Sequence, residues 1–77
     1  GSLKDPKTKL QEIVQSRFGQ LPEYNVISQV GEGESTSFIS KVTIDGEESA
    51  VGQGASKLIS EMKAAEKALV KIKDSII

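Results

Sequence analysis

Apolar residues recur at helical spacing near the start of the chain. These residues are Leu10, Ile13, Val14 and Arg17-Phe18, at positions i, i+3, i+4 and i+8, and the last of them is aromatic. Asp5-Pro6 is a helix-start signal, because Asp caps free N–H groups and Pro suits the first helical position. Gly19 marks the end of the helix, and Leu21-Pro22 prevents its continuation. The pattern therefore predicts a first helix between Pro6 and Gly19.

Alternating positions then predict two strands, at residues 24–30 and 36–44. In the first strand we place Asn25, Ile27 and Gln29 on one face; the other face carries Tyr24, Val26, Ser28 and Val30. One face of the second strand carries Phe38, Ser40, Val42 and Ile44. Asp45-Gly46 predicts a two-residue hairpin, because both central positions of a type I′ turn need positive φ. Residues 47–51 form a weaker third strand, expected at an edge protected by its charges.

A Gly-Gln-Gly stretch, residues 52–54, precedes a second helix predicted over residues 58–72. Ser56 is a good N-cap, and such a helix start offers free N–H donors that suit a phosphate. Its buried face would consist of Ser60, Ala64, Ala65, Ala68, Leu69 and Ile72. The same residues are also typical of a helix that only packs on strands and binds no phosphate. These residues alone leave both interpretations open.

The predicted fold class is α+β, in the order α-β-β-β-α. Both helices should cover one face of a three-stranded antiparallel sheet, because each has one apolar face. The other sheet face should meet solvent, with Asn25, Gln29, Lys41 and Thr43 on it. We expect one domain at residues 5–73 between an N-terminal tail, 1–4, and a C-terminal tail, 74–77. Gly1-Ser2 resembles a cloning remnant, which suggests a piece of a longer protein.

Composition excludes several function classes. The chain has 77 residues with no Cys and no His, so disulfides, structural zinc and His-based catalysis are not expected. No cofactor and no metal site are predicted, and the acidic residues have no spacing typical of a catalytic site. No segment is apolar enough to span a membrane, and no membrane partner is expected.

The charges are unevenly distributed along the chain, which the net charge of −1 does not reveal. Residues 4–17 and 56–77 have more basic than acidic residues. Residues 20–50 contain one basic residue, Lys41, and six acidic ones. A basic face is therefore possible if the two ends lie together in space.

Several motifs, in this order, resemble the double-stranded-RNA-binding domain. They are Thr-Lys-Leu-Gln-Glu at 8–12, Leu-Pro-Glu-Tyr at 21–24, Gly-x-Gly-x-Ser-Lys at 52–57 and Ala-Ala-x-x-Ala-Leu at 64–69. The resemblance covers residues 5–73 and is strongest to the C-terminal domain of ribonuclease III enzymes. Residues 59–66 are also similar to the fungal branch, which includes nuclear ribonuclease III, budding-yeast Dicer and relatives in the mitochondrial ribosome.

The resemblance implies binding of double-stranded RNA by shape. Such domains contact 2′-hydroxyls in two minor grooves and the phosphates between them, over about 16 base pairs. The first helix would enter one minor groove through Thr8, Gln11 and Glu12. The loop after the first strand would enter the next, but here it carries Glu32 and Glu34 where the family has a Gly-Pro-x-His loop. Contact through the backbone and Ser35 and a solvated turn without RNA contact both remain open.

The resemblance also implies phosphate contacts at the start of the second helix. Ser56, Lys57 and Lys63 are the candidates, whereas Leu58 and Glu61 replace two lysines of the family's Lys-Lys-x-Ala-Lys pattern. Fewer cations predict weaker binding that is less sensitive to salt. Lys67 and Lys71 are expected to be ordinary solvated lysines.

The alternative function is a degenerate domain of the same fold that contacts protein. Leu58, Ile59 and Met62 would then form the contact, to a partner, a second copy or a ribosomal scaffold; a core position is the other interpretation of these residues. We favour the RNA-binding module, held in a ribonuclease III-type parent whose catalytic residues lie elsewhere. We expect an intracellular location, in the nucleus, cytoplasm or mitochondrion.

Overall fold

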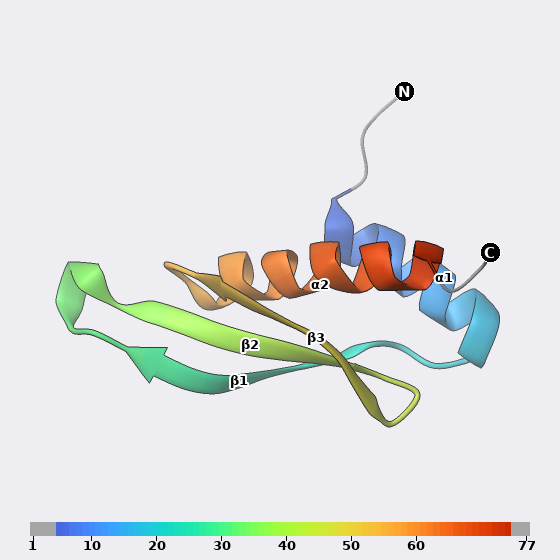
Figure 1. The fold of residues 1–77 in the computed structure, drawn as a ribbon, viewed down its shortest axis with the longest axis horizontal. Coiled ribbons are helices and arrows are strands. Elements are labelled where there is room, and N and C mark those ends of the chain that lie inside the picture. Colours follow the sequence, from blue (N-terminus) through green and yellow to red (C-terminus); the bar gives the residue numbers. More distant parts are fainter. Residues whose placement is uncertain (1–4, 75–77) are drawn as a thin grey trace.

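The computed structural model describes residues 5–74. The elements are α1 (Pro6–Phe18), β1 (Glu23–Val30), the 3-10 turn η1 (Gly33–Ser35), β2 (Ser37–Ile44), β3 (Glu47–Gly54) and α2 (Lys57–Asp74). The strands form one antiparallel sheet in the order β1-β2-β3, and both helices lie on one side of it (Figure 1). The predicted α-β-β-β-α fold is confirmed. Residues 1–4 and 75–77, most of the two predicted tails, lie outside the described residues.

The two ends of α1 are capped as the sequence predicts. The Thr8 N–H donates to Asp5 Oδ1 at 2.9 Å. Gly19, with φ of 68°, closes the helix through its N–H to the Gln15 carbonyl at 3.0 Å. The apolar stripe is shorter than predicted, because Leu10 and Val14 are buried whereas Phe18 is 41% exposed.

The β2–β3 hairpin turns at Asp45 and Gly46, whose φ values of 52° and 80° confirm the type I′ turn. β3 is an edge strand, as predicted, but it continues to Gly54 instead of ending at Val51. The extension exists because Gly54 still pairs with Phe38 of β2. The Gly-Gln-Gly stretch is therefore the end of a strand.

A β-bulge changes the faces of β1. Val26 pairs with Ser40 and Ser28 pairs with Ile39, which leaves Ile27 as the extra residue. Directly opposed residues share a face, so beyond the bulge Ser28 joins the solvent side and Gln29, opposite Phe38, joins the helix side. The prediction that Ser28 and Val30 share a face with Tyr24 and Val26 is wrong, as is the position of Gln29 on the solvent face. Alternation alone cannot reveal a bulge.

The core lies between the sheet and the helices, and α1 packs mainly against α2. Small residues let α2 approach closely: a Cβ at Gly52 would lie 2.2 Å from the Ala64 nitrogen, and one at Gly54 would lie 2.3 Å from the Ile59 side chain. These two glycines therefore serve helix–strand packing. The buried apolar side chains are Leu10, Val14, Val42, Ile44, Ala50, Ala64, Ala65, Ala68 and Ile72.

Candidate nucleic-acid interface

The first candidate region is the solvent-facing side of α1. Thr8, Gln11 and Glu12 are all exposed there, as predicted. The helix start is held by Asp5, whose pKa is lowered chiefly because its carboxylate accepts the backbone N–H of Thr8. Within residues 5–74 the Gln11 amide has no hydrogen-bond partner, so it can both donate to and accept from a ligand.

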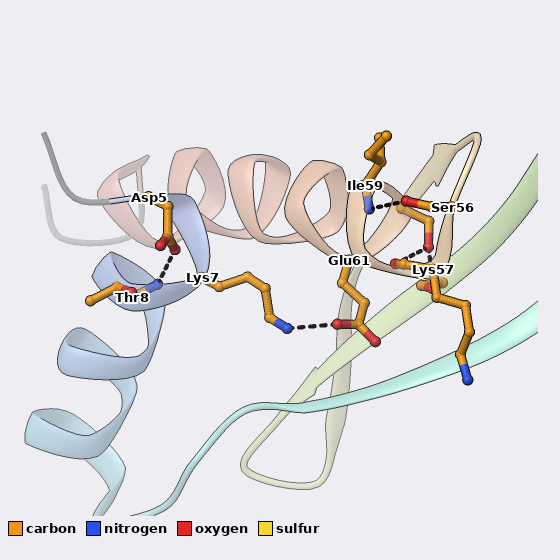
Figure 2. A network of polar contacts seen from close by, with 9 residues as sticks. Asp5, Lys7, Thr8, Ser56, Lys57, Ile59 and Glu61 are labelled. Atoms are coloured by element: carbon orange, nitrogen blue, oxygen red, sulfur yellow. Dashed lines mark hydrogen bonds and ion pairs between the residues drawn. The ribbon is translucent and has the colours of Figure 1, made fainter.

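The second candidate region is the start of α2. Ser56 Oγ accepts the N–H of Ile59 at 3.1 Å, which confirms the predicted N-cap (Figure 2). Lys57 follows on the first turn and is exposed. Its ammonium group has no partner in the part of the chain that the structure describes, so it can bind an anion.

Two buried serines fix this helix start to the sheet. Ser60 Oγ donates to the Lys57 carbonyl at 2.7 Å, and it lies 2.6 Å from Ser40 Oγ on β2. Because the single Ser60 proton serves the Lys57 carbonyl, Ser40 donates to Ser60. The first turn that presents Lys57 is thereby tied to the centre of the sheet. Neither apolar stripe alone predicts this contact, although a serine in each stripe is a signal for it.

An ion pair joins the two helices beside these regions. Lys7 Nζ on α1 lies 2.6 Å from Glu61 Oε1 on α2, and the two side chains point toward each other (Figure 2). The same ammonium lies 4.7 Å from the centroid of the Tyr24 ring. Burial, with smaller effects of Glu61 and Asp5, raises the pKa of Tyr24 to about 12. The sequence showed Glu61 only as a departure from the family pattern and gave no signal for its pairing with Lys7.

The three candidate protein-contact residues are at least partly exposed, which argues against the core interpretation. Leu58 is 58% and Ile59 is 42% exposed, and Met62 is half-buried. Leu58 and Met62 line a shallow hollow together with the start of α1, at Asp5, Lys7, Thr8 and Gln11. Ile59 points away from the Lys7–Glu61 pair and lies against Gly54. Their role as a protein contact stays a prediction.

The third candidate region is the loop between β1 and β2. Glu32, Glu34 and Ser35 are all exposed there. Position 31 requires glycine, because its φ is 91° and because a Cβ there would lie 2.4 Å from the Ser35 carbonyl oxygen. Figure 1 shows this loop at one end of the long axis, with α1 toward the other end and the start of α2 between them.

The remaining lysines of α2 differ in their surroundings. Lys63, a candidate phosphate contact, is exposed, with Nζ 3.9 Å from Glu66 Oε2. Lys67 is exposed and solvated, as predicted. Lys71 was expected to be solvated too, but its ammonium donates to the carbonyl of Ser49, the extra residue of a second bulge. Lys71 therefore supports β3.

The rest of residues 5–74 contains no cluster of acidic, Cys or His side chains that could hold a metal ion. Within the same residues no helix is long and apolar enough to cross a membrane. The geometry is instead that of a polar surface with unpaired amide and ammonium groups on rigid elements.

The family model described as "Double-stranded RNA binding motif" matches residues 6–72. The chain is 42% identical over 71 residues to a protein named Ribonuclease 3 from Pseudoalteromonas translucida, and the match covers 92% of this chain and 32% of that protein. Another Ribonuclease 3, from Psychromonas ingrahamii, is 47% identical over 68 residues, covering 88% of this chain and 30% of that protein. The chain thus spans about a third of the length of these relatives. They are bacterial proteins and leave the resemblance to the fungal branch a prediction.

A solved structure gives the same result for the fold. The solution structure of both dsRBDs of DRB4 with their linker matches with a TM-score of 0.69 and 33% identity. The match covers 88% of this chain and 44% of that one.

Proposed function

The chain belongs to the double-stranded RNA binding motif family, and from this premise we propose that it holds duplex RNA for the catalytic domain of a ribonuclease III-type protein. The named relatives are about three times as long as their matching segments, which leaves room in them for another domain. The proposed role implies an intracellular location. The nuclease activity belongs to the proposed parent and not to the polar surface described above.

The proposed mechanism is recognition of A-form shape. The major groove of RNA is too deep and narrow for side chains to read, whereas its minor groove exposes 2′-hydroxyls. Gln11 would donate to and accept from groups in the groove, and Glu12 would accept from a 2′-hydroxyl. Lys57 and the N-terminus of α2 would hold phosphates. Contacts of this kind carry little sequence information.

One observation supports the proposal most directly. Gln11 and Lys57 are exposed and lack partners within residues 5–74, yet each stands on a helix whose start is capped. The capped helices fix where these side chains start, so binding has to order only the side chains themselves, at about 0.5–1.5 kcal/mol each. This arrangement suits a rigid duplex.

The experiment is a titration of the domain with a duplex RNA of roughly 20 base pairs, long enough for a footprint of about 16. A DNA duplex of the same sequence is the control, and both are measured at two salt concentrations. We expect binding to RNA that weakens with salt, and much weaker binding to DNA. Equal affinity for both duplexes would contradict recognition through 2′-hydroxyls. Absence of binding to either at tens of micromolar protein would favour the protein-contact function at Leu58, Ile59 and Met62.

A further inference from the structure

The pair between Lys7 and Glu61 has an unusual place for an ion pair on this small domain. It joins residues 54 positions apart and is partly buried, with side chains 32% and 20% exposed. The 2.6 Å separation is that of a strong charge-assisted hydrogen bond. Salt screens a partly buried pair less than an exposed one. The Lys7 ammonium is therefore occupied in the free protein.

Lys7 nevertheless belongs to the candidate interface. It lines the same hollow as Thr8 and Gln11, two of the three α1 residues expected in the minor groove. Lys57 precedes Leu58, which also lines this hollow, and it is unpaired within residues 5–74. Lys7 and Lys57 thus both stand near the helix starts, and a carboxylate neutralises Lys7.

We propose that Glu61 limits the affinity of this domain for RNA by masking Lys7. The inference rests on the proposed RNA-binding function. A carboxylate oxygen takes the position on Lys7 Nζ that a phosphate oxygen would take. While Lys7 is paired, it does not release a counterion from RNA, so it adds nothing to the affinity or to its salt dependence. Glu61 is thus an internal competitor of phosphate.

A purely structural pair would behave differently. Partly exposed ion pairs contribute little to stability, so the fold should tolerate loss of the charge on Glu61. Gln at this position keeps the shape and can still accept a hydrogen bond from Lys7. If the pair only joined the helices, Glu61→Gln would leave RNA binding unchanged or weaken it. Masking predicts the opposite direction.

The test compares Glu61→Gln with Glu47→Gln, which makes the same charge change on exposed β3 beside the hairpin turn. With the RNA duplex, we expect Glu61→Gln to bind about 2- to 5-fold tighter, the effect of one added ion pair. Its salt slope should steepen by about 0.7–0.9 for one added phosphate contact. Glu47→Gln should keep the slope of the unmodified domain. Equal slopes in the two variants would overturn masking, with thermal unfolding showing that both are folded.

The double variant identifies the cation that is released. In a Lys7→Met background, Glu61→Gln should no longer increase the affinity, because Lys7 is the group that Glu61 masks. A gain that persists without Lys7 would overturn the inference and assign the effect to the general field of Glu61.

Elution from heparin separates the inference from the proposed function, because heparin is a polyanion without the shape of a duplex. Later elution of Glu61→Gln than of Glu47→Gln supports masking even if neither binds RNA, in which case only the RNA-binding function fails. If both variants elute from heparin at the same salt concentration, masking is overturned. RNA binding by the unmodified domain would then still leave the proposed function in place.

Discussion

The junction of the two helix starts and the β1–β2 loop are built in different ways, although both are candidate RNA contacts. At the junction, side chains bond across elements: Lys7 to Glu61, and Ser40 to Ser60, which in turn bonds to the Lys57 carbonyl. The loop is closed by backbone bonds, from Ser35 N to the Glu32 carbonyl at 3.0 Å and from Thr36 N to the Gly33 carbonyl at 3.2 Å. Its carboxylates are exposed.

The difference indicates where the binding energy comes from. The contacts at the junction fix the helix starts that present Gln11 and Lys57, whose own polar groups are unpaired within residues 5–74, so the junction should supply most of the affinity. The loop offers backbone groups and Ser35, but it also carries two negative charges that repel a polyanion. We therefore expect substitutions at the junction to have larger effects than those in the loop.

The largest effect is expected from Gly52→Ala. The added Cβ would lie 2.2 Å from the Ala64 nitrogen, a backbone atom that cannot move alone, so α2 and β3 must shift apart. We expect a loss of about 3 kcal/mol of unfolding free energy, measured by denaturant titration. The matched loop variant is Gly33→Ala, where φ is 55° but nothing lies within 4 Å of the Cβ. It should cost only about 1 kcal/mol, the penalty of the left-handed conformation. Equal losses would refute the difference between the regions.

The next largest effect is expected from Gln11→Ala. Loss of one or two groove hydrogen bonds should weaken RNA binding by about 3- to 10-fold without a change in the unfolding midpoint. The control is Gln53→Ala, which removes the same type of side chain from an exposed position on β3. Isothermal titration of both variants checks the assignment. An affinity for Gln11→Ala as high as that of Gln53→Ala would remove α1 from the interface.

A smaller and more specific effect is expected from Lys57→Ala. Loss of one phosphate contact should lower the slope of log affinity against log salt by about 0.7–0.9. Lys67→Ala is the matched control, because Lys67 is also exposed on α2 and has no partner within residues 5–74. Titrations at four salt concentrations give both slopes. A slope unchanged by Lys57→Ala would place Lys57 outside the site.

The smallest effect is expected from the loop double variant, Glu32→Gln with Glu34→Gln. Exposed charges are screened within about 8 Å at physiological salt, so the affinity should rise by no more than about 2-fold. The salt slope should stay the same, because no cation is added. A gain larger than the loss caused by Gln11→Ala would show that the loop carboxylates, and not the junction, limit binding.

Much of the fold could be predicted because its signals are local. Asp5-Pro6, Gly19, Asp45-Gly46 and Ser56 each act on the backbone within a few residues, and the structure has the expected cap or turn at each. The bulge at Ile27 could not be predicted, since it depends on how β1 aligns with β2. For the same reason, the sequence did not show why residues 52 and 54 are glycines, which is the close approach of the helix packed above them.

The sequence by itself determined the elements, their order and the exposed polar face of α1, because periodicity and capping are properties of neighbouring residues. The tertiary structure alone decided which groups meet across the chain. It set Glu61 against Lys7 and Lys71 against Ser49, and it left Lys57 unpaired within residues 5–74. Such pairings depend on how two packed elements approach each other, which packing of the whole core sets and no local pattern records.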